Sequence, residues 1–255
     1  MDSTVHISRT LRASSQAIWR ALTEDMAAWQ ADQASGVVEL GGHVLLTWPT
    51  LGAEADLTAI EVVSPRRLSF STGATTVTFT LDGSTLHLSH SGLASVDEAE
   101  GTRASWKVAL ATLDQYLAYH EGRPRQTAWA FQRAHTTAQA AHVYFTDEAA
   151  LKIWLTRAGS VGNDGSHVDL ELGWGERLTG QVLGITSGRD VALSWSERSE
   201  SALVLRTLPA PFSDSERLLV LTWSCWGHEP DAATVERFES ALKRLARVLS
   251  HPADA

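Results

Sequence analysis

Large apolar and small polar residues alternate most regularly between Thr75 and His90. On both sides of the Asp82-Gly83 dipeptide, one face of the pattern carries the larger side chains, which are Val77, Phe79, Leu81, Leu86, Leu88 and His90. Alternation with a period of two is typical of a β-strand, because successive side chains point to opposite faces. Asp-Gly is favoured in type I′ turns, where both central residues need a positive φ angle. The segment therefore predicts a β-hairpin that turns at Asp82 and Gly83.

Two other segments of the first half repeat apolar residues at helical spacing. Residues 14–29 do so, and Ser14 or Ser15 at their start can cap a helix. A second apolar stripe consists of Trp106, Leu110, Leu113 and Leu117. Ser95 and Glu98 have capping-box spacing ahead of it, and residues 121–125 contain the glycine and proline of a linker. These patterns predict a short helix near the start of the half and a long amphipathic helix at its end.

Shorter apolar runs between the two helices predict further strands. They cover His43–Trp48, Ala59–Val63 and Leu68–Ser71. A glycine turn at Leu40–Gly42 precedes the first run, and the Ser64-Pro65 dipeptide ends the second. A run of strands bracketed by helices indicates an α+β fold with a mostly antiparallel sheet, whose apolar face packs against the long helix.

The second half of the chain repeats the first. Residues 139–148 align with residues 16–25, which lie 123 positions earlier. The last apolar stripe lies 132 positions after the stripe of the first half and consists of Phe238, Leu242, Leu245 and Leu249. A repeat of this length indicates a domain duplication, because the units of a solenoid are far shorter. The sequence therefore predicts two domains, at residues 1–122 and 127–255.

Two shorter matches support the duplication. Leu170–Gly173 aligns with Val38–Gly41, and Leu193–Trp195 aligns with Leu68–Phe70. The offset between the halves is 123 at the first helix and 132 at the last helix, so insertions fall in the loops between the helices and the strands, where loops tolerate them.

Composition narrows the classes of partner. The chain has 255 residues and a formal net charge of −9, so we expect neither nucleic acid nor a membrane surface as partner, since both favour basic patches. Its apolar runs are far shorter than the roughly 20 residues of a transmembrane helix. Residues 1–6 lack the basic and apolar regions of a secretory signal. A single cysteine, Cys225, cannot form an internal disulfide, and together these features predict a cytoplasmic protein.

A family resemblance rests on four segments of the first half. They are Ile18–Thr23, Leu40–Gly42, Pro65–Phe70 and Trp106–Leu117. These segments resemble the Val-Trp-x-Ala-Leu-Thr helix, the Gly-Gly turn, the Pro-x-x-Leu-x-Phe segment and the closing helix of the activator of Hsp90 ATPase homologue (AHSA1-like) family, within the START/Bet v 1-like (SRPBCC) superfamily. The second half departs from the pattern, with His142 and Val143 in place of the Ile-Trp pair and Trp174 in place of a turn glycine.

The resemblance implies two helix-grip domains, each a curved antiparallel sheet wrapped around a long C-terminal helix. Relatives use the cavity between sheet and helix to hold lipids, sterols, plant hormones or polyketides. Some relatives are cyclases or hydrolases, and the namesake domain docks on a chaperone. The fold does not choose among these functions.

Candidate catalytic chemistry is sparse. The sequence contains no nucleophile elbow, no His-Glu-x-x-His pattern and no phosphate-binding loop. His87 and His90 are three residues apart on one strand, so they face opposite sides and cannot share a metal ion. Asp97 and Glu98 complement the dipole of a helix N-terminus, and Cys225 lies in an apolar run where its thiol is inert. We therefore predict no catalytic residue, no metal site and no cofactor.

The leading interpretation is a non-enzymatic protein that binds a small hydrophobic molecule. Aromatic and apolar residues with few polar groups are typical of such a cavity. The predicted ligand-binding residues are Trp29, His43, Trp48, Phe79, Leu88, His90, Trp106 and Leu113. The divergence of the second half further suggests that one copy has lost its pocket and become structural.

Two alternatives stay open. The first is a co-chaperone-like module for protein–protein interaction, which predicts a filled interior and an exposed apolar patch. The second is a cyclase- or hydrolase-like enzyme acting on a hydrophobic or aromatic substrate, with His90 or His43 as acid or base. An enzyme of this kind predicts a histidine paired with a carboxylate in the cavity.

Overall fold

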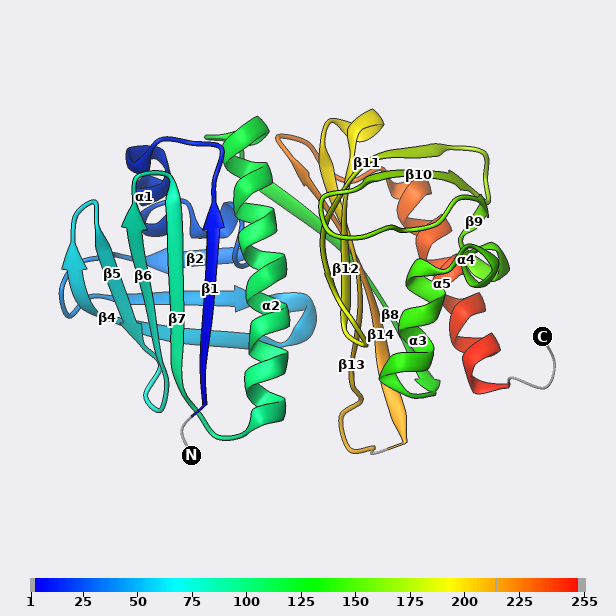
Figure 1. Cartoon of the computed structure of the whole chain (residues 1–255), viewed down its shortest axis with the longest axis horizontal. Coiled ribbons are helices and arrows are strands. Elements are labelled where there is room, and N and C mark those ends of the chain that lie inside the picture. Colours follow the sequence, from blue (N-terminus) through cyan, green and yellow to red (C-terminus); the bar gives the residue numbers. More distant parts are fainter. Residues whose placement is uncertain (1–2, 214, 252–255) are drawn as a thin grey trace. The chain divides into compact units, whose positions relative to one another are not determined.

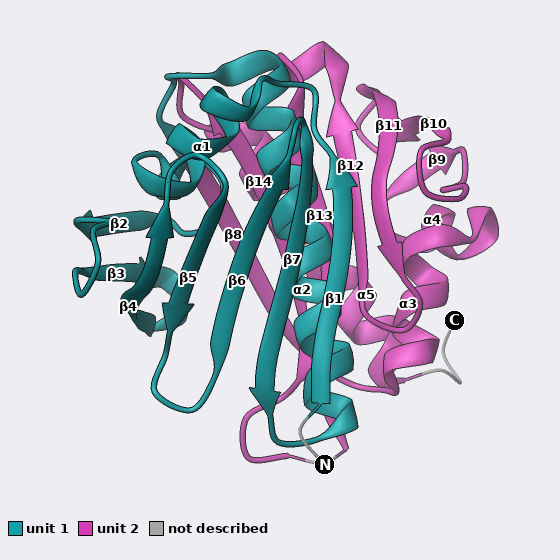
Figure 2. Cartoon of the chain, turned by 60° about the vertical axis from the view of Figure 1, so that its left-hand side comes forward, with its two compact units in different colours: residues 1–125 teal, residues 126–255 magenta. Residues whose placement is uncertain are grey.

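The computed structural model consists of two compact units, which Figure 2 shows in separate colours. The units are Met1–Arg125 and Gln126–Ala255. Their description covers residues 3–213 and 215–251, so the outermost residues of the two predicted domains lie outside the described part of the chain.

The first unit is built on a seven-stranded antiparallel sheet (Figure 1). Its strands are β1 (Ser3–Thr10), β2 (Gln33–Gly36), β3 (His43–Trp48), β4 (Ala53–Val63), β5 (Arg67–Ser71), β6 (Thr76–Asp82) and β7 (Thr85–Leu93). Its helical segments are α1 (Ser15–Thr23), η1 (Met26–Ala28), η2 (Pro49–Leu51), α2 (Val96–Gln115) and the π-helical turn η3 (Tyr116–His120). The strand order is β1-β7-β6-β5-β4-β3-β2, and α2 packs along β1 and β7.

The second unit repeats this plan. Its strands are β8 (Arg125–His135), β9 (Thr156–Ala158), β10 (His167–Leu172), β11 (Arg177–Thr186), β12 (Asp190–Trp195), β13 (Ser201–Pro209) and β14 (Glu216–Trp226). Its helices are α3 (Ala138–Thr146), α4 (Glu148–Trp154), η4 (Ser196–Arg198) and α5 (Ala232–Ser250). The strand order, β8-β14-β13-β12-β11-β10-β9, is that of the first unit. The predicted duplication and the α+β helix-grip class are therefore confirmed.

The structure corrects one of the matches between the halves. Leu170 lies inside β10, whereas Val38, to which the sequence aligns it, lies in the loop before β3. Gly36 at the end of β2 and Gly159 directly after β9 are equivalent positions in the two units. Their φ angles are +107° and +101°. At both positions a Cβ atom would lie within 2.3 Å of a backbone carbonyl oxygen, so the chain passes too close for any side chain.

The predicted hairpin forms between β6 and β7, but its turn differs from the prediction. Asp82 pairs with Thr85, so the central residues of the turn are Gly83 and Ser84. Gly83 has a φ of +58°, and Ser84 is not among the described residues with positive φ. This is the pattern of a type II′ turn, which needs glycine only at its first central position. The prediction of a type I′ turn at Asp82 and Gly83 is wrong because the ladder continues through Asp82.

Both long helices carry their predicted apolar stripes into a core. The hydroxyl of Ser95 accepts a hydrogen bond from the backbone N–H of Glu98, as the capping pattern predicts. Helix α2 begins at Val96, directly after Ser95. Leu110 and Leu113 of α2 are fully buried, as is Leu242 of α5. None of the helices in the described part of the chain is long and apolar enough to cross a membrane.

Candidate functional site

The side chain of His90 points from β7 toward α2 in the first unit. The Nε1–H of Trp106 donates a hydrogen bond to Nδ1 of His90 at 3.0 Å, and the two ring centroids are 6.2 Å apart. Because an indole nitrogen can only donate, Nδ1 is the acceptor, and the neutral imidazole carries its proton on Nε2. Burial lowers the pKa of His90, while the nearby Glu98 raises it by a smaller amount. His90 is therefore a neutral donor on the inner face of the sheet.

The Nε2 atom of His90 is buried and has no hydrogen-bond partner in the described structure. Most buried polar atoms in proteins are hydrogen-bonded, so an unpaired donor needs an explanation. A ligand that accepts this hydrogen bond provides one.

Apolar side chains surround the imidazole. Phe79 meets the ring of Trp106 edge to face, with centroids 5.6 Å apart, and Leu88 pairs with Phe79 across the ladder. Phe79, Leu88 and Leu113 of α2 are at most 3% exposed, whereas Trp106 and His90 are partly exposed. The structure thus brings Phe79, Leu88, His90 and Trp106 together as an apolar floor with a single polar donor.

Trp29, His43 and Trp48 do not join this cluster. His43 lies on the outer face of the sheet, since it alternates with the buried Val44, and its Nδ1 is 3.2 Å from the Asp56 carboxylate. Trp29 is 2% exposed and its indole donates to the carbonyl of Ala21 at 2.9 Å, so it is a core residue with no donor left for a ligand. Trp48 is partly exposed at the end of β3.

The other reactive side chains that the sequence singles out do not join the His90 cluster. His87 lies on the face opposite His90, as its spacing predicts, and bonds to Ser8 instead. Burial raises the pKa of the Cys225 thiol to about 12, so this thiol is protonated at neutral pH. Glu98 acts on His90 through space, without a hydrogen bond among those described. No group of three or more metal-ligating side chains occurs among the described residues.

The second unit places an apolar pair where the first has His90 and Trp106. Trp223 lies on β14, which corresponds to β7, and Phe238 of α5 corresponds to Trp106. Their ring centroids are 6.1 Å apart at 71°, close to the 6.2 Å and 72° of His90 and Trp106. Trp223 satisfies its own indole by donating to the hydroxyl of Ser201 at 2.9 Å. In the second unit, two aromatic residues therefore replace the polar pair of the first unit, and the indole N–H of Trp223 is already hydrogen-bonded.

Two further tryptophans fill the space around Phe238. The centroids of Trp174 and Trp195 lie 5.3 Å and 6.1 Å from that of Phe238. A gap lined by Trp223 and Phe238, between the sheet and α5, leaves no room for a water molecule. No local sequence pattern predicts the contact between Trp195 and Trp223, because it depends on the pairing of β12, β13 and β14.

Sequence analysis also missed a polar hollow on the outer face of the first sheet. It is lined by side chains that include His6, Ser8 and Arg67. Alternation of polar residues along β1, from Thr4 to Thr10, is the signal that could have shown it, since such residues share one face.

A sheet of this topology closed by a long C-terminal helix, with an inward polar group on an apolar floor, defines a helix-grip domain of the START/Bet v 1-like class. Residues 12–118 match the family described as Activator of Hsp90 ATPase homolog 1-like protein. The matched residues span most of the first unit, and the second unit repeats its strand order.

Solved structures show the same kind of similarity. The chain is 17% identical to DynU16, a protein of the dynemicin biosynthetic locus, with 98% of both chains covered and a TM-score of 0.42. It is 19% identical to Aha1 of Colwellia psychrerythraea, solved as a dimer, with 48% of this chain and 99% of that chain covered and a TM-score of 0.42. It is 24% identical to an AHSA1-like protein of Rhizobium etli, with 48% and 86% covered and a TM-score of 0.39. A search of the curated proteins finds no match.

Proposed function

We propose that the first unit binds a small, mostly apolar molecule between its sheet and α2, and that the second unit binds none. The observation that carries this proposal is the buried Nε2–H of His90, which has no partner. Leaving a buried donor unpaired costs about 1–3 kcal/mol. A ligand with a carbonyl, ether or hydroxyl oxygen would accept this hydrogen bond and remove the cost.

The surroundings of His90 support an apolar ligand body. Phe79 and Leu88 provide hydrophobic surface, and the indole of Trp106 is partly exposed beside them. The indole N–H is already bonded to His90, so it does not compete for the ligand. An apolar site with a few placed polar groups is the usual composition of a small-molecule pocket. The proposed ligand is therefore a largely hydrophobic molecule with one oxygen acceptor.

A thermal-shift screen against lipids, sterols, flavonoids and aromatic polyketides tests this function. A compound that binds the native state raises the melting temperature in a saturable way. We expect His90→Leu to weaken binding of that compound about 5- to 10-fold, as the loss of one hydrogen bond implies. His87→Gln, on the same strand but the opposite face, is the matched control and should leave binding unchanged. A silent panel, or equal affinity for wild type and His90→Leu, contradicts the proposal.

An interaction module is the second candidate, because exposed apolar side chains gather in one part of the first unit. Val37, Leu40 and Ile60 are 58%, 75% and 47% exposed. The N–H of Gly41 donates to the carbonyl of Ala59, which places Leu40 and Ile60 on neighbouring segments. Clusters of exposed apolar residues often mark protein interaction sites.

Affinity capture from a cell lysate tests the second candidate. A specific partner should be lost with the double variant Leu40→Ser/Ile60→Ser. It should be retained with Phe212→Ser, which removes an exposed aromatic residue of the second unit. Loss of the partner with both variants points to non-specific adhesion and rejects the candidate.

A cytoplasmic location belongs to the same proposal. Its support is the single cysteine, Cys225, which is buried and cannot form an internal disulfide.

A further inference from the structure

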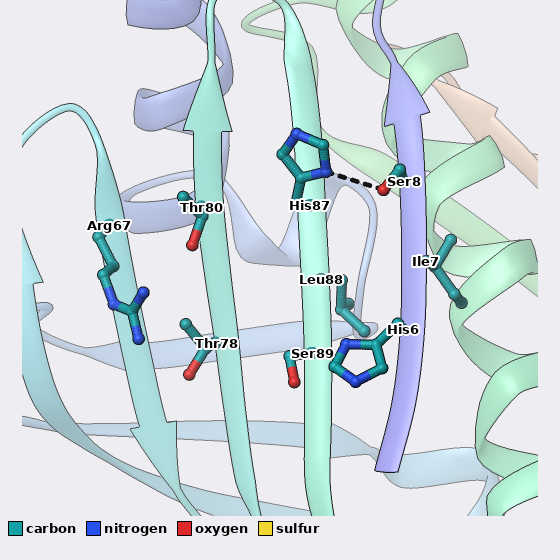
Figure 3. A pocket seen from close by; sticks show the side chains of 9 residues that line it. All are labelled: His6, Ile7, Ser8, Arg67, Thr78, Thr80, His87, Leu88 and Ser89. Atoms are coloured by element: carbon teal, nitrogen blue, oxygen red, sulfur yellow. Dashed lines mark hydrogen bonds between the residues drawn. The ribbon is translucent and has the colours of Figure 1, made fainter.

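The outer face of the first sheet holds a hollow (Figure 3), whose volume is about 370 Å³. It includes His87 and therefore lies on the side of β7 away from His90. Four strands, β1, β7, β6 and β5, supply its lining. Its polar side chains are those of His6, Ser8, Arg67, Thr78, Thr80, His87 and Ser89. The hollow falls within the usual size range of small-molecule sites.

The strand register brings these side chains into two rows. Ser8 lies opposite His87, which lies opposite Thr80, which lies opposite Arg67. In the next row, His6 lies opposite Ser89, which lies opposite Thr78. Because directly opposed residues of an antiparallel pair point to the same face, all seven side chains project to the same side. The hollow is therefore set by the ladder itself and not by a loop.

Arg67 supplies the positive charge of the hollow. Its Nε donates to the Glu61 carboxylate at 2.7 Å, and its two terminal amino groups have no partner among the described residues. In Figure 3 the guanidinium bends toward Thr78. An arginine held through Nε keeps the paired donors of its outer edge available for an oxyanion.

Glu61 acts as the anchor of Arg67 and does not line the hollow. Ser69 lies 3.0 Å from both Glu61 and Thr78. Since a carboxylate can only accept, Ser69 donates to Glu61 and accepts from Thr78. The pKa of Glu61 is held below its usual value by its hydrogen bond to Arg67 and, to a lesser degree, by that to Ser69. The hydrogen bonds of Glu61 to Ser69 and to Nε of Arg67 therefore hold the guanidinium in position.

Two imidazoles add ring nitrogens to the hollow. Nδ1 of His87 is 2.8 Å from the hydroxyl of Ser8, which fixes the ring (Figure 3). Its Nε2 stays available, and His6 stands one row away on β1. No aspartate or glutamate lines the hollow. The polar groups that line the hollow are therefore nitrogen atoms and hydroxyls.

We propose that this outer-face hollow is a second ligand site, which takes a small molecule bearing a phosphate group. Arg67 provides the charge-assisted hydrogen bonds, and His6, His87 and the hydroxyls of Thr80 and Ser89 complete the shell around the phosphate oxygens. The net charge of −9 repels large polyanions, so a compact phosphomonoester fits better than nucleic acid or an anionic membrane.

Isothermal titration of the full-length protein with glycerol 3-phosphate at pH 7, in a buffer free of phosphate, tests the proposal. We expect saturable binding of glycerol 3-phosphate and weaker binding of inorganic phosphate, with no binding of glycerol. Arg67→Gln should weaken binding by at least about tenfold, because it removes a charge-assisted pair of hydrogen bonds. Arg66→Gln is the matched control, since Arg66 is exposed beside Arg67 but does not line the hollow.

Two results would overturn the proposal. The first is no saturable binding of either phosphate compound up to about 50 mM, which corresponds to an affinity too weak for a specific site. The second is an equal loss in Arg66→Gln and Arg67→Gln, which indicates attraction to surface charge alone. The exposed His87→Gln variant provides a test that does not depend on the fold of Arg67→Gln, and it should weaken binding at least about threefold. His90→Leu should leave phosphate binding unchanged, which separates this site from the inner one.

Discussion

The hydrogen bond from Trp106 to Nδ1 places the proton of neutral His90 on Nε2, and burial disfavours a second proton. The folded pKa of His90 is therefore lowered, whereas histidine in an unfolded chain titrates near about 6.5. Between these two values the unfolded chain binds more protons than the folded protein. Acidification through this range consequently favours unfolding.

We expect the free energy of unfolding to fall as the pH drops below about 6.5 and to level off below the folded pKa of His90. His90→Gln should make this fall shallower. His142, whose pKa is also lowered by burial, keeps part of the slope in both proteins. Urea unfolding at a series of pH values measures the effect. Identical slopes for wild type and His90→Gln would show that the burial of His90 has no influence on stability.

Gly36 and Gly159 are matched positions where a residue-scale substitution is informative. A Cβ atom would lie 2.0 Å from the carbonyl oxygen of His43 at the first and 2.3 Å from that of Asp169 at the second. Both residues also have positive φ angles. The clash and the backbone strain act together at each site.

We expect Gly36→Ala and Gly159→Ala each to lower the free energy of unfolding by more than about 3 kcal/mol. Gly73→Ala is the control, because its φ is +84° but nothing lies within 4 Å of the added atom. Its cost should be that of the backbone conformation alone, about 1–2 kcal/mol. Equal costs at all three positions would mean that the close approach to the carbonyl oxygen does not matter.

At the scale of elements, the two long helices differ in how their central aromatic residue is packed. Phe238 of α5 is 1% exposed and touches Trp174, Trp195 and Trp223. Trp106 of α2 is partly exposed and touches Phe79 and His90. The aromatic residue of α5 is therefore enclosed by other aromatic rings, whereas that of α2 keeps part of its ring exposed.

The two aromatic residues should respond differently to truncation. Phe238→Ala should cost about 3–5 kcal/mol, the usual range for a large aromatic residue removed from a packed core. Trp106→Ala should cost less, because part of the ring is already exposed. Urea unfolding followed by circular dichroism compares the two variants. A larger loss for Trp106→Ala would contradict the assignment of the open site to the first unit.

The elements themselves follow largely from the sequence. The period of two predicts β6 and β7 and places His87 and His90 on opposite faces, and the helical stripe predicts α2. The start of β4 escapes prediction because polar residues such as Glu54 and Asp56 lie on its outer face. Local periodicity reports which face a residue takes, so it serves best where one face is buried.

The site is harder to predict than the elements, because it depends on which distant residues meet. His43 precedes the buried Val44 on β3 and so faces outward, although it is among the ligand-binding residues predicted from the sequence. Trp29 packs inward because the carbonyl of Ala21 satisfies its indole. The hydrogen bond between Trp106 and His90 joins a helix to a strand and has no signature in either segment alone. Such contacts are set by tertiary packing.

For the whole molecule, the duplication yields two sheets of one topology with different interiors. The first keeps a histidine with an unpaired donor, and the second replaces the polar pair with Trp223 and Phe238. A ligand that binds the native state should therefore protect the elements of one unit alone.

Hydrogen–deuterium exchange of the full chain, with and without the panel compound that raises the melting temperature most, tests this central claim directly. We expect slower exchange in β7 and α2, where His90 and Trp106 lie, because a bound ligand suppresses local opening of the elements it contacts. We expect no change in β14 and α5, which carry Trp223 and Phe238. Protection of β14 and α5, or of both units equally, would contradict the account.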